Sequence, residues 1–163
     1  MSSNYPQKVI KTSIDKILKF REHMKTLPLI EVMFPVGVKN VKKYTKRSDK
    51  PFTPRMKGTP IHVKSALNYN DMIRHMKLTK TYQGIGNGEK IKWTYLKPNS
   101  MNLDTMALKG FEDPAPIEKF VQANIDCDKI FKSAFANKLN DFYSAMKWGS
   151  IPENNNLGKF FQF

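Results

Sequence analysis

Two neighbouring stretches, Lys57-Gly-Thr-Pro-Ile-His-Val-Lys-Ser-Ala-Leu-Asn-Tyr-Asn70 and Gly86-Asn-Gly-Glu-Lys-Ile-Lys-Trp-Thr-Tyr-Leu96, decide the fold. In the first, Pro60 stands where a helix can begin, and the apolar residues after it recur at helical spacing, which predicts a helix over 60–76. The second opens on a Gly-Asn-Gly turn and then alternates apolar with polar residues, which predicts a half-buried strand. The apolar members of that alternation are Ile91, Trp93 and Tyr95.

Shorter patterns on either side predict an α+β fold that is mostly helical with a small antiparallel sheet. Apolar residues at helical spacing predict an amphipathic helix over 5–25, and a pair of prolines introduces a second helix near 116–123. The apolar, partly β-branched run 29–34 predicts a strand that ends at a proline. Residues 104–108 are expected to form a short partner for the strand at 91–95.

A long apolar stripe predicts the last helix, from Cys127 to Met146, which Trp148-Gly149 closes. We expect this stripe to be core rather than a cofactor site. Its members are Cys127, Ile130, Phe131, Ala134, Phe135, Leu139, Phe142, Tyr143 and Met146. The chain of 163 residues is long enough for one modest core, so we expect a single domain over 1–152 and a tail over 153–163.

Positive charge is concentrated in the first part of the chain. The net charge is +14; residues 1–97 carry 21 Lys/Arg and 6 Asp/Glu, whereas residues 98–163 carry 7 and 8. Such a one-sided field favours a polyanion, because each neutralised phosphate releases counterions, so nucleic acid is the leading partner. The alternative is a solvated lysine-rich surface that serves solubility.

The densest cationic segment, residues 39–57, is also rich in proline and glycine. The helix predicted at 60–76 begins directly after it, and free N–H groups at a helix start favour a phosphate. His62 lies at that start, where it could help to bind the phosphate. A buried, hydrogen-bonded role for this histidine is an equal alternative.

Cysteine content and hydropathy indicate where in the cell the protein is found. Cys127 is the only cysteine, so an intrachain disulfide is excluded and a reducing compartment fits. The sequence has no run of about 18 apolar residues. We therefore expect a soluble, intracellular protein with no membrane partner.

Several motifs in fixed order resemble the C-terminal thumb domain of family B replicative DNA polymerases, especially those of T-even-type bacteriophages. The resemblance spans nearly the whole chain. Its motifs are Phe34-Pro-Val-Gly-Val-Lys-Asn40, Lys57-Gly-Thr-Pro-Ile-His-Val-Lys64, Leu67-Asn-Tyr-Asn70, Gly88-Glu-Lys-Ile-Lys92, Tyr95-Leu-Lys97, Ile125-Asp126, Phe131, Phe135 and the Phe-rich terminus.

The resemblance implies a thumb-like domain that holds primer–template duplex by contacts to its backbone, in the cytoplasm of an infected bacterial host. The residues expected to contact duplex DNA are Lys39, Asn40, Lys43, Lys57, Gly58, Thr59, His62 and Lys64. The family's C-terminal peptide binds a ring-shaped sliding clamp, and the residues here that match its character are Leu157, Phe160, Phe161 and Phe163. Docking of this tail on the parent fold is the alternative.

The sequence lacks the two aspartate motifs of the palm domain that hold catalytic metal ions in this family. The chain is therefore not expected to polymerise alone, and Mg²⁺ is expected in a palm-containing partner rather than here. It would be one piece of a divided polymerase or a fragment, with the amino-terminal helix and the Phe34 region facing the palm.

Two competing interpretations concern other chemistry. Asp126 and Asp128 could share a metal ion, but their position at a predicted helix start favours N-terminal capping. A free-standing RNA- or single-strand-binding protein would stack bases on aromatic residues between lysines. The aromatic residues available for that are Tyr69, Tyr82, Trp93 and Tyr95.

Overall fold

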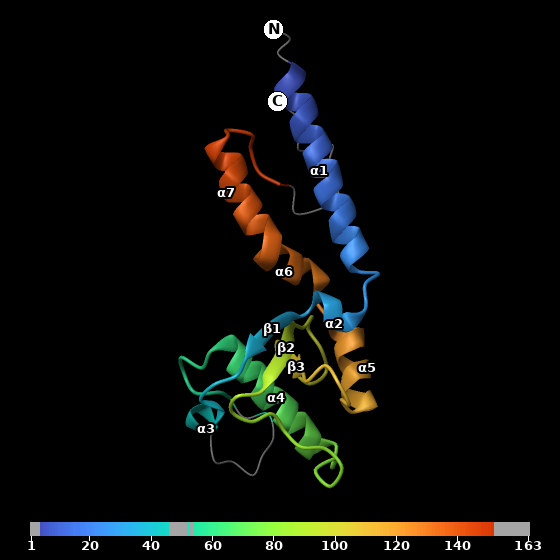
Figure 1. The fold of residues 1–163 in the computed structure, drawn as a ribbon, viewed down its shortest axis with the longest axis vertical. Coiled ribbons are helices and arrows are strands. Elements are labelled where there is room, and N and C mark those ends of the chain that lie inside the picture. Colours follow the sequence, from blue (N-terminus) through green and yellow to red (C-terminus); the bar gives the residue numbers. More distant parts are fainter. Residues whose placement is uncertain (1–3, 46–51, 53, 152–163) are drawn as a thin grey trace. The chain divides into compact units, whose positions relative to one another are not determined.

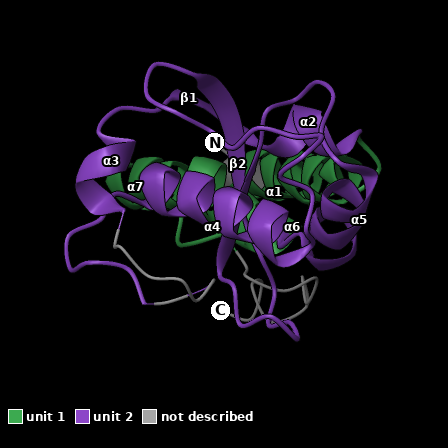
Figure 2. Ribbon diagram, turned by 90° about the horizontal axis from the view of Figure 1, so that it is seen from below, with its two compact units in different colours: residues 1–27, 127–163 green, residues 28–126 purple. Residues whose placement is uncertain are grey.

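The computed structural model describes residues 4–45, 52 and 54–151, and it has the expected α+β class (Figure 1). Two compact units divide the chain. Residues 1–27 and 127–163 form unit 1, and residues 28–126 form unit 2 (Figure 2). The tail predicted over 153–163 lies outside the described residues.

Unit 1 is built from two antiparallel helical segments (Figure 1). The first is α1 (Asn4–Met24), which confirms the helix predicted over 5–25; the second runs through α6 (Cys127–Phe131), the π-helical turn η1 (Lys132–Ala136) and α7 (Asn137–Ala145). A small core joins them. Its buried members are Ile10, Ile14, Leu18, Tyr143 and Ile151.

The last predicted helix is correct in position but wrong in regularity and burial. Ile130, Phe131 and Tyr143 are buried, whereas Phe142 is 52% exposed and Phe135 and Met146 are also exposed. The π-helical turn changes the angular spacing between residues before and after it, so a stripe drawn at 3.6 residues per turn leaves the buried face. The expectation that the whole stripe is core is therefore wrong.

The sheet of unit 2 has the order β1-β2-β3 and is antiparallel throughout. Its strands are β1 (Phe34–Gly37), β2 (Lys90–Tyr95) and β3 (Thr105–Leu108). Phe34 pairs with Trp93, and Trp93 with Ala107. The strands predicted at 91–95 and 104–108 are confirmed as neighbours.

The prediction of a strand over 29–34 is wrong for most of that run. Residues Leu29–Val32 form the one-turn helix α2, whose N-cap is Pro28. The Glu31 N–H donates to the Pro28 carbonyl at 2.9 Å, so the proline directs the chain into a helical turn despite the β-branched residues. Only from Phe34 does the chain pair with β2.

Helix α4 (Ile61–His75) confirms the predicted helix at 60–76 and packs against β2 and β3. The short helix α3 (Val41–Tyr44) packs against α4, and α5 (Ala115–Asn124) follows the predicted 116–123 closely. In β2, Ile91 and Thr94 are both buried although they point to opposite faces. The half-buried strand expected from the alternation is therefore covered on both faces at these two positions.

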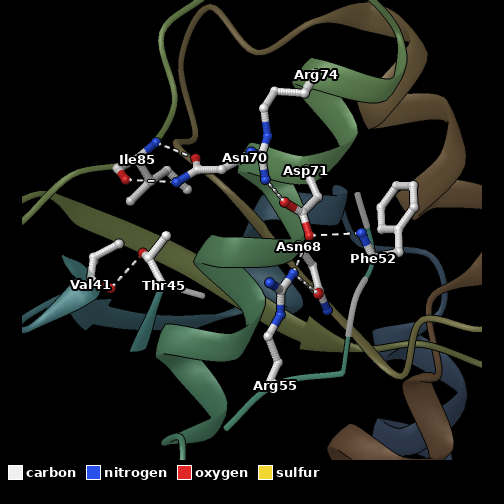
Figure 3. Close-up of polar contacts among 9 residues, drawn as sticks. All are labelled: Val41, Thr45, Phe52, Arg55, Asn68, Asn70, Asp71, Arg74 and Ile85. Carbon is white, nitrogen blue, oxygen red and sulfur yellow. Dashed lines mark hydrogen bonds and ion pairs between the residues drawn. The ribbon is translucent and has the colours of Figure 1, made fainter. Parts of the chain in front are cut away.

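Gly84 lies where the loop before β2 meets α4. The Asn70 amide holds this loop through two hydrogen bonds to Ile85: Nδ2 donates to the Ile85 carbonyl at 3.0 Å, and the Ile85 N–H donates to Oδ1 at 2.6 Å (Figure 3). A Cβ on Gly84 would lie only 2.6 Å from Asn70 Oδ1. The close approach therefore requires glycine.

We predict that Gly84→Ala lowers the free energy of unfolding by about 1–3 kcal/mol, because the added methyl group displaces a hydrogen-bonded amide. Gly86→Ala is the matched control, since a Cβ there meets no atom within 4 Å. That control should stay within about 0.5 kcal/mol of the parent in urea unfolding. Equal midpoints for the two variants would contradict the packing argument.

Candidate nucleic-acid interface

The amino end of α4 is preceded by an exposed cationic turn. Gly58 has φ +83°, a backbone conformation that glycine adopts without strain. Thr59 closes the turn, because both its N–H (3.2 Å) and its Oγ1 (2.6 Å) donate to the Met56 carbonyl. Lys57 is exposed in this turn, directly before a helix whose N-cap residue, Pro60, makes no side-chain capping hydrogen bond. N–H groups at such an end are suited to phosphate oxygens.

An open cleft of about 560 Å³ lies beside this turn. It brings together three of the predicted contact residues, Gly58, Thr59 and Lys64. Residues that the sequence did not single out also line it, among them Arg55, Asn68 and Asp104. The cleft therefore has a mixed polar and apolar lining and carries charges of both signs.

Lys64 is not a free cation in this cleft. Its Nζ donates to Asp104 Oδ2 at 2.7 Å, and the two side chains are 33% and 61% exposed. Exposed ion pairs of this kind are weak. Lys64 can still turn to a phosphate, but Asp104 compensates part of its charge.

The second cationic segment comprises Lys39 and Asn40, which follow β1, and Lys43, which lies within α3. Lys39, Asn40 and Lys43 are all exposed there, and Asn40 has the left-handed φ of 59° at the N-cap of α3. The Val41 N–H donates to Asn87 Oδ1 at 2.7 Å, which ties the start of α3 to the turn before β2. Because α3 also packs on α4, both cationic segments are supported by the same helix.

His62 is partly buried in the first turn of α4. It is therefore neither fully exposed to a phosphate nor fully buried, the two alternatives that the sequence left open.

Asp71 was not identified from the sequence, although it is the only acidic residue between Pro51 and Gly88. A lone carboxylate in a basic stretch is a signal for an internal salt bridge, and Asp71 does bind Arg55 and Arg74.

Tyr69, a candidate for base stacking, is buried at 1% exposure inside α4. Its hydroxyl donates to Asp113 Oδ1 at 2.8 Å, and the same carboxylate accepts the N–H groups of Lys109 and Gly110 at 2.9 and 2.8 Å. Burial raises the pKa of Tyr69 above its usual range, and the Asp113 hydrogen bond raises it further. Tyr69 therefore holds α4 to the segment before α5 and is not available to a base.

The aromatic residues of β2 are engaged with β1. The rings of Phe34 and Trp93 lie 4.8 Å apart between centroids, and those of Trp93 and Tyr95 lie 5.0 Å apart. Both β2 side chains are partly buried. They form a cluster on the sheet rather than separate stacking platforms.

Asp126 and Asp128, which the sequence offered for metal binding or for helix capping, both lie at the start of α6. Asp126 directly precedes α6 and Asp128 lies in its first turn, as the capping prediction requires. Burial opposes ionisation of Asp128, but Arg21 Nε at 3.0 Å and Lys25 Nζ at 3.6 Å outweigh it and lower its pKa. Within residues 4–45, 52 and 54–151, no group of three His, Cys, Asp or Glu side chains is placed to hold a metal ion.

Comparison of the chain with protein-family models and with curated proteins found no match. None of the helices in the described ranges combines the length and the apolar character that a membrane crossing requires. The predicted clamp-binding residues, which are Leu157, Phe160, Phe161 and Phe163, lie outside the described part of the chain.

Proposed function

We propose that this chain is the duplex-holding, thumb-like part of a family B replicative DNA polymerase of the T-even phage type. The observation that carries the proposal is the mounting of two exposed cationic segments on one helix: Lys39 and Lys43 are carried by the chain around α3, and Lys57 by the turn before α4. Lysines fixed in this way can follow the phosphates of a duplex without reading its bases.

In this proposal the chain works in the cytoplasm of an infected bacterial host, together with a palm-containing partner that holds the catalytic Mg²⁺. The tail tethers the assembly to the sliding clamp. Burial of Tyr69 and packing of Trp93 against Phe34 favour the thumb proposal over a free-standing RNA- or single-strand-binding protein, since they remove aromatic faces that such a protein needs.

Fluorescence anisotropy with three labelled probes tests the proposal. We expect primer–template duplex to bind more tightly than single-stranded DNA or unpaired RNA of equal length, with little dependence on base sequence. The slope of log K against log salt should be about −3 or steeper, because each of three lysines that meets a phosphate contributes about −0.9. Preferential binding of unpaired RNA would contradict the thumb proposal and support the RNA-binding alternative.

Activity of a reconstituted enzyme is a second test. Mixing the chain with a palm-containing polymerase subunit should restore primer extension that neither component shows alone. Stable, inactive separation of the two would count against a divided polymerase.

A further inference from the structure

Asp71 is a buried carboxylate that binds Phe52 and Arg55, in the chain before α4, to that helix. Its side chain is 2% exposed. Oδ2 accepts the Phe52 N–H at 3.0 Å and Arg55 Nη2 at 2.5 Å, and Oδ1 accepts from Arg74 Nη2 (Figure 3). Two of the three donors, Phe52 and Arg55, belong to the segment before the helix rather than to the helix itself.

The Arg55 guanidinium is held by Asp71 and by Asn68. Its side chain is 12% exposed, and the same Nη2 also lies 2.9 Å from Asn68 Oδ1. Asn68 is itself held, because its Nδ2 donates to the Thr105 carbonyl of β3 at 2.9 Å. The guanidinium therefore joins its segment to α4 and, through Asn68, to the sheet.

A charge as deeply buried as Asp71 is costly unless it is paired, so this group of residues is expected to hold its geometry. Arg55 stands two positions before Lys57 and three before Gly58. Fixing Arg55 therefore limits where the Lys57 turn can lie relative to the amino end of α4. A lysine held in place loses less conformational entropy when it binds a phosphate than one on a loose segment.

We infer that Asp71 is a positioning residue for duplex binding: it fixes the Phe52 backbone and the Arg55 side chain on α4 so that Lys57 is presented at the amino end of that helix. The inference rests on the proposed function and names the residue that organises its interface. It predicts that duplex affinity changes in the direction opposite to the one that simple electrostatics gives. Removing a negative charge from a DNA-binding surface strengthens binding by simple electrostatics, whereas loss of a positioning carboxylate weakens it.

The test compares two isosteric changes that each remove one negative charge, Asp71→Asn and Asp104→Asn. We expect Asp71→Asn to weaken binding of a 20-base-pair duplex by about tenfold and to reduce the magnitude of the salt slope by about one, the loss of one phosphate contact. Asp104→Asn releases Lys64 from its ion pair and should strengthen binding by a few-fold. Affinity of Asp71→Asn equal to or above that of the parent would overturn the inference.

Amide hydrogen exchange without DNA separates this inference from the proposed function. In Asp71→Asn the amides of Phe52 and Thr59 should exchange faster, while that of Ile85, which Asn70 protects, should not change. Unchanged exchange at Phe52 and Thr59 would overturn the positioning role whatever the DNA result. If the parent chain ignores duplex DNA, the proposed function fails, and faster exchange would still establish that Asp71 fixes the segment.

Arg55→Lys gives an independent variant in case Asp71→Asn does not fold. It keeps the charge but loses the planar group that reaches both Asn68 and Asp71. The positioning role predicts weaker duplex binding, by about threefold, and faster Thr59 exchange; an effect of net charge alone predicts no change. Affinity and exchange equal to those of the parent would overturn the inference.

Discussion

Replacing Lys39, Lys43 and Lys57 together with glutamine is expected to weaken duplex binding by about a hundredfold or more near 0.1 M salt. All three side chains are exposed on the candidate interface. Each phosphate contact that is lost forfeits the release of about 0.9 counterion, so the salt slope should fall in magnitude by about 2.7. The fold should survive, because exposed substitutions away from special features change stability by about 0.5 kcal/mol or less.

A second triple variant keeps the total charge equal and so isolates position. Lys80, Lys97 and Lys119 are also exposed in unit 2 but lie outside the predicted contact set. Their replacement with glutamine should cost far less affinity and leave most of the salt slope. Equal losses for the two triple variants would show that duplex binding follows net charge and would contradict the proposed interface.

Single variants rank the lysines that flank the start of α4. Lys57→Gln should weaken binding more than Lys64→Gln, because Asp104 already compensates part of the Lys64 charge. From the sequence alone the two lysines could not be distinguished, because Asp104 lies 40 positions from Lys64 and no local pattern links Asp104 to Lys64.

The elements that could be predicted are those whose local signals agree with their packing. In α4, the proline at the start and the apolar spacing point to the same helix, and that helix packs on the sheet as the spacing requires. The strand at 90–95 follows a turn of glycine and asparagine, and its partner at 105–108 lies where the sequence placed it.

The errors arise where two local signals conflict or where contacts are distant. At 29–34 the β-branched residues favoured a strand, but Pro28 starts a helical turn. After Phe131 a π-helical turn breaks the 3.6-residue spacing, and no periodic pattern reports such a turn in advance. The Asp71–Arg55 pair joins a helix to an irregular segment, so its geometry depends on the fold rather than on spacing.

Deletion of residues 157–163 is expected to abolish binding of the sliding clamp and to leave both the fold and duplex binding intact. The described chain is fixed just before this tail: Ile151 is buried, and its N–H donates to Asn140 Oδ1 at 2.7 Å. Residues 152–156 are mostly polar and separate this anchor from four large apolar side chains. If the tail serves the clamp, its removal should leave this buried anchor and the core around it unchanged.

The expected loss is large because a few aromatic anchors carry most of the energy of a small interface. Calorimetry with the purified clamp should show at least about a hundredfold weaker binding after deletion. In a polymerase reconstituted with the palm-containing partner, clamp-dependent long synthesis should disappear, since tethering contributes about 10²–10⁴ in effective affinity. Lys159→Gln, inside the same peptide, is the control that should retain clamp binding.

Thermal unfolding distinguishes this role from docking of the tail on its own chain. Ile151→Ala removes a buried side chain and should destabilise unit 1 by about 2–4 kcal/mol while leaving the clamp peptide in place. The tail deletion should do the reverse, with an unchanged midpoint and no clamp binding. A fall in the midpoint of the deleted chain, comparable to that of Ile151→Ala, would mean that the aromatic residues belong to the core of this protein and that the clamp must be bound elsewhere.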